Sequence, residues 1–333
     1  MTRVAVLGVG AIGRNHARVY REMANVELVG VADPQPGAAD NIARLYGTRA
    51  YTDHRALLEA ERPEAVTVSV PTYLHFPVVN DALAAGCHVL VEKPIAATPD
   101  EALAMIATAE ADNRVLMVGH IERYNPAIIE LRRRLVAGEL GRVFQIHTRR
   151  LGPFPPRVRD VGVVVDLATH DIDAMRYLTG HEVTRLYAET RQQVHTSNED
   201  LFSGMLRFSD DTLGILEINW LTPTKIRELW VTGERGMFRA DYLTQDLYFY
   251  QNPEADDTHW GTLSVLRGVS EGAMTRFAFQ KREPMRAEQE AFIAAVNGDR
   301  SGIVSGQDGL AALRIAQALV RSGKEHQLLE IEG

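Results

Sequence analysis

The chain has a single cysteine, an excess of acidic over basic residues and no long apolar run. Cys87 is alone among 333 residues and cannot form an intramolecular disulfide. The formal net charge of -8 argues against non-specific binding to nucleic acid or anionic membranes, because both would repel the surface. No apolar stretch approaches the roughly 20 residues that span a bilayer, and the N-terminus lacks the pattern of a signal peptide. These absences predict a cytoplasmic protein that binds neither nucleic acid nor membranes.

The N-terminal part alternates short apolar runs with amphipathic stretches. With 45% hydrophobic residues the chain is able to bury a large core, and its length suffices for about two domains. The runs that predict strands are TRVAVL, VELVGVADP, RAYT, AVTVSV, HVLVEKP and RVLMVGH, with predicted helices between them. This alternation is typical of a parallel, doubly wound sheet. We therefore predict an α/β domain over residues 1–121.

Three glycines with the spacing G-x-G-x-x-G lie between the first strand and the first helix. Gly8 allows a tight turn, Gly10 lets the backbone approach a pyrophosphate, and Gly13 lets the helix pack close to the strand. Asp33, at the end of the second strand, is placed to bind the adenosine ribose and to repel a 2′-phosphate. The pattern predicts a Rossmann domain that binds NAD in preference to NADP. The residues expected to hold it here are Gly8, Gly10, Ala11, Ile12, Gly13 and Asp33.

From about residue 142 the pattern changes to alternating polar and apolar residues. The runs that predict strands are RVFQIHTRRL, VTRLYAETRQQV, LFSGMLRF, TLGILEINWL, IRELWVTG, GMFRADY and DLYFYQN. Helices are predicted near residues 126–137, 166–178, 285–297 and 307–322. We predict an α+β domain over residues 122–333 with a large, mostly antiparallel sheet. The last helix is a candidate to pack back on the first domain.

Three motifs make the chain resemble a known family. They are GVGAIG near the N-terminus, VEKP at 91–94, and the D-x-x-x-H pattern of Asp166 and His170. In this order they resemble the glucose-fructose oxidoreductase, inositol dehydrogenase and rhizopine catabolism family (Gfo/Idh/MocA) of NAD(P)-dependent oxidoreductases, over essentially the whole chain. The resemblance implies a Rossmann domain followed by an α+β domain, assembly into a homodimer or homotetramer, and Lys93, Asp166 and His170 as catalytic residues.

The residue types of this trio suit the oxidation of a secondary alcohol. Removing the hydroxyl proton at neutral pH calls for a base such as histidine. In a helix Asp166 is a neighbour of His170, so its carboxylate is placed to orient the imidazole or to bind a second substrate hydroxyl. Lys93 follows a strand at the carboxyl edge of the sheet, where it can polarise the reacting oxygen or relay its proton.

These residues also have other interpretations. Taken alone, Glu92 and Lys93 are explained as well by an ion pair at a strand end. Asp166, His170 and Asp173 have a spacing at which a helix can hold a metal ion. Because no second cysteine or histidine cluster completes a ligand shell, we predict no metal site. Asp173 is also a candidate for local pairing only.

Further residues are predicted to line the cofactor crevice because they follow strands. They are Pro71, Thr72, His75, Glu92, Lys93 and Asn125. His75 has an alternative place in the first turn of a helix that faces water. In GHIERYNP, Tyr124 and Asn125 are candidates to contact nicotinamide or substrate, while Pro126 is expected to begin the next helix.

Residues 142–159 contain five arginines and no acidic residue, although the chain is acidic overall. The fork of a guanidinium matches the oxygens of a phosphate, and the prolines in this stretch restrict its conformation. We predict that part of the cluster binds a pyrophosphate of the substrate, with Arg150, Arg157 and Arg159 as candidates. Two or three of the five are expected to point outward from a strand or to pair with acids at a subunit contact.

A pyrophosphate makes the predicted substrate a nucleotide sugar. RRLGPFPPRVRD and GHIERYNP resemble the branch of the family that oxidises the 3-hydroxyl of UDP-N-acetylglucosamine to a 3-keto sugar. The N-acetylglucosaminuronate analogue is an alternative substrate. An inositol or free-sugar dehydrogenase would share the catalytic residues without needing the arginines, and a non-catalytic NAD-binding regulator would keep only the glycine pattern. The predicted function is NAD-dependent oxidation of a sugar secondary alcohol, with these alternatives open.

Overall fold

The chain forms two compact units. The computed structural model describes residues 1–155, 161–194, 197–252 and 272–331. The first unit comprises Met1–Ile121 and Glu283–Arg314, and the second comprises Glu122–Arg282 and Ile315–Gly333. A segment close to the C-terminus therefore belongs to the same unit as the N-terminus.

The first unit contains a parallel sheet of six strands in the order β3-β2-β1-β4-β5-β6. The strands are β1 (Thr2–Leu7), β2 (Val26–Ala32), β3 (Arg49–Tyr51), β4 (Ala65–Val68), β5 (His88–Glu92) and β6 (Leu116–Gly119). Val4, Ala5 and Val6 of β1, which point alternately to the two faces of the sheet, are fully buried, as expected of a central strand covered on both faces. The strand order reverses between β1 and β4, which confirms the predicted doubly wound fold and marks the ligand-binding point of such sheets.

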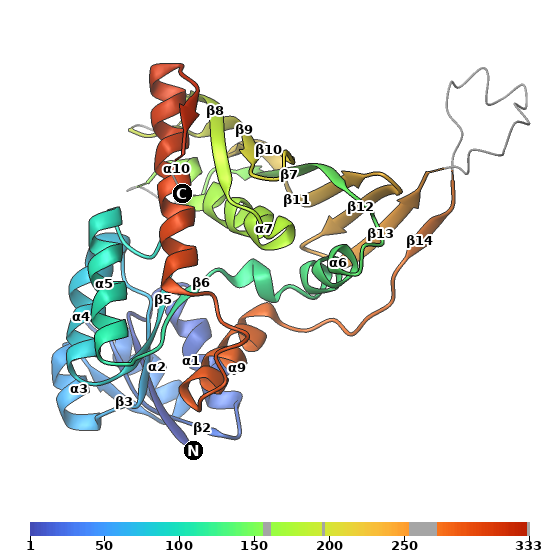
Figure 1. The fold of residues 1–333 in the computed structure, drawn as a ribbon. Coiled ribbons are helices and arrows are strands. Elements are labelled where there is room, and N and C mark those ends of the chain that lie inside the picture. The colour runs from blue at the N-terminus through green and yellow to red at the C-terminus, as the bar shows by residue number, and fades with distance from the viewer. Residues whose placement is uncertain (156–160, 195–196, 253–271, 332–333) are drawn as a thin grey trace, which may run out of the picture. The chain divides into compact units, whose positions relative to one another are not determined.

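Helices cover both faces of this sheet (Figure 1). They are α1 (Gly13–Glu22), α2 (Ala38–Tyr46), α3 (His54–Glu61), α4 (His75–Ala84), α5 (Pro99–Ala111) and α9 (Pro284–Val296). The helices α3, α4 and α5 pack in a row, whereas α1 contacts α2 and α9. Local sequence sets where they begin. For example, α5 starts at a capping box in which Thr98 and Glu101 each accept the other's backbone N–H.

The second unit contains a sheet of nine strands in the order β14-β13-β12-β11-β7-β10-β9-β8-β15. The strands are β7 (Val143–Pro153), β8 (Val183–Arg191), β9 (Leu201–Phe208), β10 (Leu213–Asn219), β11 (Leu221–Gly233), β12 (Gly236–Asp241), β13 (Asp246–Gln251), β14 (Met274–Arg276) and β15 (Leu329–Glu330). β7 and β10 pair in parallel, and the other neighbours that the structure describes pair antiparallel. This confirms the predicted mostly antiparallel sheet. The strands β14 and β15 are too short to show a periodicity in the sequence.

One face of this sheet is covered by helices (Figure 1). The helical segments of the unit are η2 (Ile121–Tyr124), α6 (Pro126–Val136), η3 (Val164–Ala168), α7 (Thr169–Thr179) and the end of α10 (Gly306–Glu325). α7 packs on β7, and α6 packs on β12 and β13. On β7, Ile146, Thr148 and Arg150 are buried, whereas the alternate residues between them are half-exposed. The alternation seen in the sequence is thus the alternation between these two faces.

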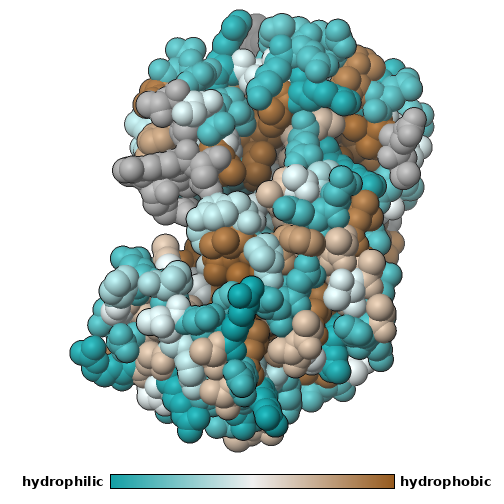
Figure 2. All heavy atoms as spheres, turned by 90° about the vertical axis from the view of Figure 1, so that its left-hand side faces the viewer, coloured by the Kyte–Doolittle hydropathy of each residue, from teal (hydrophilic) through white to brown (hydrophobic). Residues whose placement is uncertain are grey.

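The hydropathy of one face of the molecule is drawn in Figure 2. Hydrophobic residues lie there in separate patches among hydrophilic ones. Within the described ranges, no helix is both long and apolar enough to cross a membrane. Even α10, with 20 residues, carries charged side chains along its length.

A buried ion pair joins α7 to the sheet of the second unit. Arg150 of β7 donates through Nε and Nη2 to the two carboxylate oxygens of Asp171, at 2.7 and 3.0 Å, and through Nη1 to Glu122 at 2.9 Å. The side chains of Arg150 and Asp171 are only 5% and 1% exposed. Each charge therefore depends on the other for compensation.

Replacing Arg150 with alanine is expected to lower the free energy of unfolding by about 3–5 kcal/mol, because Asp171 would remain as an uncompensated buried charge. The matched control is Arg149→Ala on the opposite face of β7. Arg149 pairs with Glu217, and these side chains are 34% and 41% exposed, so its loss should cost less than about 1 kcal/mol. Urea denaturation at neutral pH measures both changes. Equal costs for the two variants would contradict the assignment.

Candidate active site

The first unit has a glycine turn between β1 and α1. Gly8 has φ +88°, and a Cβ there would lie 2.5 Å from the carbonyl oxygen of Ser69. A Cβ on Gly13 would lie 1.9 Å from the carbonyl oxygen of Gly8. Both positions therefore require glycine for the fold itself. A Cβ on Gly10 would meet no atom within 4 Å, so the turn is open there, as the close approach of a pyrophosphate requires.

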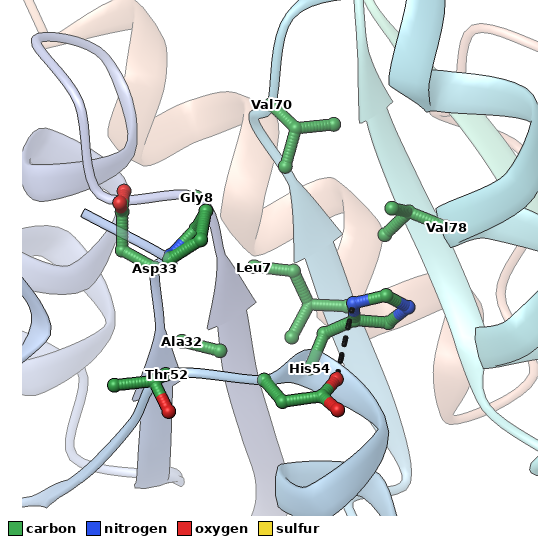
Figure 3. A pocket seen from close by; sticks show the side chains of 10 residues that line it. Leu7, Gly8, Ala32, Asp33, Thr52, His54, Val70 and Val78 are labelled. Carbon is green, nitrogen blue, oxygen red and sulfur yellow. Dashed lines mark ion pairs between the residues drawn. The ribbon is translucent and has the colours of Figure 1, made fainter.

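Asp33 lies beside this turn. Its Oδ2 accepts a hydrogen bond from the backbone N–H of Val9 and its Oδ1 accepts one from Gln35, both at 2.9 Å. These bonds hold the carboxylate in place, while each oxygen keeps a further lone pair for a ribose hydroxyl. Figure 3 shows Asp33 next to Gly8, with Val70 on the other side of a cavity of about 270 Å³. The apolar side chains that line this cavity are Leu7, Ala32, Val70 and Val78.

The turn and the cavity fit the adenosine and pyrophosphate of a dinucleotide. The first turn of α1 contains no acidic side chain, so the positive end of its dipole is available to an anion. The apolar walls suit an adenine ring, and the carboxylate of Asp33 suits ribose hydroxyls and disfavours a 2′-phosphate. The residues that would hold this part of the cofactor are Gly8, Gly10, Ala11, Ile12, Gly13 and Asp33.

The structure of the loop after β4 agrees only in part with what the sequence predicts for it. Two of the residues predicted to line the cofactor crevice lie at the carboxyl end of β4. Pro71 is exposed, and Thr72, in η1 (Thr72–Leu74), is half-buried. His75 is 1% exposed, and its Nδ1 and Nε2 lie 2.8 and 3.0 Å from the carbonyl oxygens of Pro94 and Val70. Burial lowers the pKa of His75. Both interpretations of His75, cofactor contact and exposure to water, are therefore wrong, because its ring joins two backbone segments inside the fold.

Lys93 directly follows β5. Its side chain is half-buried, and its backbone N–H donates to Oε2 of Glu92 at 3.3 Å. Because all six strands run parallel, Lys93 lies at the same carboxyl edge as the glycine turn. Its predicted contacts with cofactor and substrate remain predictions.

Glu92 belongs to a buried network that no sequence pattern indicated. Nε2 of His16 in α1 lies 2.8 Å from Oε1 of Glu92, and Gln289 of α9 donates to Nδ1 of His16 at 2.7 Å. Because Nδ1 accepts from Gln289, we assign the ring proton of His16 to Nε2, which donates a hydrogen bond to Oε1 of Glu92. Burial alone would raise the pKa of Glu92, but the hydrogen bond from His16 and the charge of Lys93 lower it. Because 19% of the Glu92 side chain is exposed, its contact with the cofactor stays a prediction.

Glu288 of α9 is a second carboxyl group in this region. It is fully buried, and neither of its oxygens has a hydrogen-bond partner among the described residues. Burial and the negative charge of Glu92 raise the pKa of Glu288 well above its usual range. These opposite shifts favour the protonated form of Glu288 and the ionised form of Glu92. The signal in the sequence is the spacing from Met285 and Phe292, which places Glu288 on the apolar side of its helix.

In the second unit, Asp166 and His170 lie where two kinds of helix meet. Asp166 is in η3, a π-helical turn, and His170 is in the first turn of α7. Both side chains are half-buried. The prediction of one regular helix over residues 166–178 is wrong at its start, because the wider π turn changes the offset between these two residues. Such turns occur frequently at functional sites.

Asp173 has a structural partner. Its two carboxylate oxygens accept hydrogen bonds from Nε and Nη2 of Arg123 at 2.8 and 2.6 Å, and its side chain is 1% exposed. A metal site shared with Asp166 and His170 would require these same oxygens. The pairing is also not local, since the two residues are 50 positions apart.

Asn125 has a structural role as well. Its Oδ1 accepts the backbone N–H of Ala127 at 3.1 Å at the start of α6, and its Nδ2 donates to the carbonyl oxygen of Tyr242 at 3.0 Å. At 2% exposure the side chain is inside the fold, so the cofactor contact predicted for Asn125 is wrong. Tyr124 is also buried, and its substrate contact stays a prediction. Pro126 begins α6, as predicted.

The arginine cluster is largely paired. Three of its members bind carboxylates of the second unit: Arg142 with Glu234, Arg149 with Glu217, and Arg150 with Asp171. Arg142 and Arg149 are 73% and 34% exposed, which agrees with the expectation that two or three point outward, but their acidic partners belong to the same unit and not to a subunit contact. The substrate contact predicted for Arg150 is wrong, because all three guanidinium nitrogens already donate to carboxylates inside the fold. Arg157 and Arg159 lie outside the described residues.

No pattern in the sequence singles out Arg227 of β11 as a functional residue. It is the cross-strand neighbour of Arg150. Burial and the charge of Arg150 lower the pKa of Arg227 to about 10. In the run IRELWVTG nothing distinguishes it from a solvated strand residue, because the charge that acts on it comes from another strand.

Comparison with known proteins identifies the family. The model described as the oxidoreductase family with NAD-binding Rossmann fold matches residues 2–120, and the model of the GFO/IDH/MocA C-terminal domain matches residues 128–239. The chain belongs to the GFO/IDH/MocA oxidoreductase family. Both halves of the chain contribute to this assignment, as the resemblance in the sequence implied.

Individual members of the GFO/IDH/MocA family match over the full length. The chain is 32% identical to UDP-N-acetylglucosamine 3-dehydrogenase of Acidithiobacillus ferrooxidans, over 96% of this chain and 95% of the relative. A solved structure of that enzyme has a TM-score of 0.84 at 31% identity and covers 97% of this chain and 98% of its own. Inositol 2-dehydrogenase of Rhizobium meliloti is 29% identical over 99% of each chain.

These similarities confirm the cofactor and the enzyme class. The protein is a GFO/IDH/MocA dehydrogenase that acts on CH–OH groups with NAD. The glycine turn and Asp33 are the residues of this chain that fit NAD.

Replacing Glu288 with glutamine tests the buried acid. Its folded-state pKa is raised, so the folded protein holds a proton that the unfolded chain releases above about pH 4.3. The stability from Glu288 is full below that pH and is lost as the pH rises toward the folded-state pKa. Between pH 5 and 8, the wild type should therefore lose up to about 1.4 kcal/mol per pH unit relative to Glu288→Gln in the free energy of unfolding.

The control for this measurement is Glu290→Gln on the same helix, whose side chain is 38% exposed. That variant should follow the pH dependence of the wild type. A wild type and a Glu288→Gln variant with parallel pH profiles would show that Glu288 is ionised in the folded protein.

Proposed function

We propose that this GFO/IDH/MocA dehydrogenase oxidises the 3-hydroxyl of UDP-N-acetylglucosamine to the 3-keto sugar. The observation that carries the proposal is the full-length similarity to UDP-N-acetylglucosamine 3-dehydrogenase, in sequence and in fold. The similarity extends over 96% of the chain. It therefore includes the segments that contain Lys93, Asp166 and His170.

In this proposal Lys93, Asp166 and His170 carry out the acid–base chemistry. NAD, when bound, supplies the hydride acceptor. The ammonium of Lys93 polarises the reacting hydroxyl and stabilises the developing negative charge on its oxygen. His170 accepts the hydroxyl proton, and Asp166 orients the imidazole or binds a neighbouring hydroxyl of the sugar. These three roles are supported by the residue types and by their order in the chain, which match the motifs of the family.

We assign cofactor binding to the domain of residues 1–121 and substrate binding to that of residues 122–333. Pro71, Thr72 and Glu92 complete the cofactor site in this assignment, and Tyr124 contacts the substrate. We also propose a homodimer or homotetramer. The sheet face of the second unit opposite α6 and α7 has a shallow groove lined by Tyr187, Met205 and Ile215, and Met205 is 48% exposed, which suits contact with a second copy.

Oxidation of inositol is the second candidate. It is favoured by the 29% identity to inositol 2-dehydrogenase over 99% of both chains. An inositol dehydrogenase needs the same base and the same cofactor, but its substrate is uncharged. The two candidates therefore differ in whether the second unit binds an anion.

A substrate panel decides between them. Purified protein with NAD is incubated separately with UDP-N-acetylglucosamine, UDP-N-acetylglucosaminuronate, other UDP-sugars, myo-inositol and free hexoses, and NADH formation is followed by absorbance. We expect the highest kcat/KM with UDP-N-acetylglucosamine, and mass spectrometry should show a product lighter by two hydrogens. Good turnover of inositol without turnover of any UDP-sugar would establish the second candidate and exclude the first.

Replacing Lys93 with alanine should lower kcat by about 10²- to 10⁴-fold, the usual contribution of a general acid–base group. His170→Ala should do the same, and neither should change the dissociation constant of NAD by more than about threefold. Steady-state kinetics and a fluorescence titration with NADH measure both quantities. The control is Lys324→Ala, at an exposed position of α10. A Lys93→Ala variant with near wild-type kcat would remove Lys93 from the chemistry.

A further inference from the structure

Two arginines of the second unit lie opposite each other on neighbouring strands. In the antiparallel pairing of β7 with β11, Arg150 is opposite Arg227 and Thr148 is opposite Leu229. Thr148 and Leu229 are fully buried and lie on the same side of their strands as the arginines. Both arginines therefore lie on the face that α6 and α7 cover. Like charges directly opposite each other destabilise a sheet.

The two guanidinium groups differ in what surrounds them. Arg150 is neutralised by Asp171 and Glu122. Arg227 donates through Nη1 to the carbonyl oxygens of Leu151 and Ile226. Over the described ranges no carboxylate forms an ion pair with Arg227, and its Nε and Nη2 have no protein acceptor there. These two nitrogens of Arg227 are therefore left without an acceptor from the described part of the chain, although the two carboxylates beside Arg150 lie near enough to act on its charge.

The surroundings make this charge costly. Burial, and next the charge of Arg150, lower the pKa of Arg227 to about 10, while Asp171, Glu122 and Asp166 act in the opposite direction. The effect of Asp166 shows that Arg227 lies within electrostatic range of the segment proposed to bind the reacting sugar. A partly buried arginine that is kept there beside Arg150, with the N–H groups of Nε and Nη2 unoccupied, points to a ligand that supplies their acceptors.

The backbone next to Arg227 leaves its side chain accessible. Residues 222–225 of β11 drop out of the pairing with β7. Gly152 of β7 lies next to this gap, and a Cβ built on it would be 3.8 Å from Nη1 and from Nη2 of Arg227. A longer side chain at position 152 would extend over the guanidinium, whereas glycine leaves this side open. Nε and Nη2 of Arg227 are both accessible to solvent.

We propose that Arg227 binds an oxyanion of the substrate, either a phosphate of its nucleotide or a carboxylate on its sugar. The inference rests on the proposed function, because it requires an anionic sugar substrate. Nε and Nη2 present two parallel N–H donors, which match two oxygens of a phosphate or a carboxylate. The bound anion accepts hydrogen bonds from Nε and Nη2 of Arg227 as Asp171 does from Nε and Nη2 of Arg150. A neutral polyol gains nothing from this contact, so Arg227 determines specificity.

The test replaces Arg227 with methionine, which removes the charge and the donors but keeps an apolar stem. We expect KM for UDP-N-acetylglucosamine and the inhibition constant of UDP each to rise by about 10- to 100-fold. The dissociation constant of NAD should change by less than about threefold. The melting temperature should stay the same or rise, because a like-charge pair is removed. Arg227→Lys should recover only part of the affinity, since lysine lacks the fork.

Arg149→Met is the matched control, because Arg149 lies on the opposite face of β7 and pairs with Glu217. It should change neither KM nor inhibition by UDP. With Arg227→Met, a higher KM for every UDP-sugar together with weaker inhibition by UDP identifies the phosphate as the anion. A higher KM confined to UDP-N-acetylglucosaminuronate identifies the sugar carboxylate.

Two outcomes overturn the inference while the proposed function stands. The first is that Arg227→Met leaves KM unchanged for all UDP-sugars. The second is that KM is unchanged but the melting temperature falls, which would show that Arg227 has a structural role. The proposed function fails separately, in the wild type, if no UDP-sugar is oxidised. In that case the inference falls with it.

Discussion

The ion pair between Arg150 and Asp171 joins the sheet of the second unit to α7. Asp171 follows His170 directly, so a carboxylate that is held by two hydrogen bonds also fixes the backbone that carries the proposed base. The pair of Arg123 and Asp173 adds a second connection from the same helix. Ionisable residues in this short segment thus have two kinds of task. Asp171 and Asp173 hold the helix, while Asp166 and His170, the residues proposed for the acid–base chemistry, have partly exposed side chains.

The same constraint, that a charge removed from water needs a counter-charge, acts in the first unit in a different way. Glu92 is half-buried, and His16 and Lys93 compensate its charge and lower its pKa. Glu288 has no such partner among the described residues, and burial together with the charge of Glu92 raises its pKa and favours its protonated form. One proton thus lets two carboxyl groups lie close together next to the strand end that carries Lys93. The electrostatic surroundings of the proposed catalytic lysine are set in part by a helix that comes from the end of the chain.

Arg227 is the place where the described structure does not supply an acceptor for two guanidinium nitrogens, Nε and Nη2. In a GFO/IDH/MocA dehydrogenase the chemistry of hydride transfer is shared by members with neutral and with nucleotide-linked substrates, as the two named relatives show. The difference between such substrates is therefore expected in the second unit and in its charges. An arginine that is partly buried, lies next to Arg150 and is open on one side is a physical means of making that difference.

The sequence by itself determined the two sheets, the glycine turn, Asp33 and the family, because these depend on periodicity and on residues close together in the chain. It did not determine the roles of buried polar side chains. His75, Asn125 and Arg150 were expected at the ligand, yet their partners are Pro94, Tyr242 and Asp171, which only folding brings near. Arg150 and Arg227 look alike in the sequence, and each lies on a strand of alternating pattern. Only the tertiary structure decided that Arg150 pairs directly with carboxylates and that Arg227, opposite it in the register of β7 against β11, does not, because electrostatic energy depends on distance in space and not along the chain.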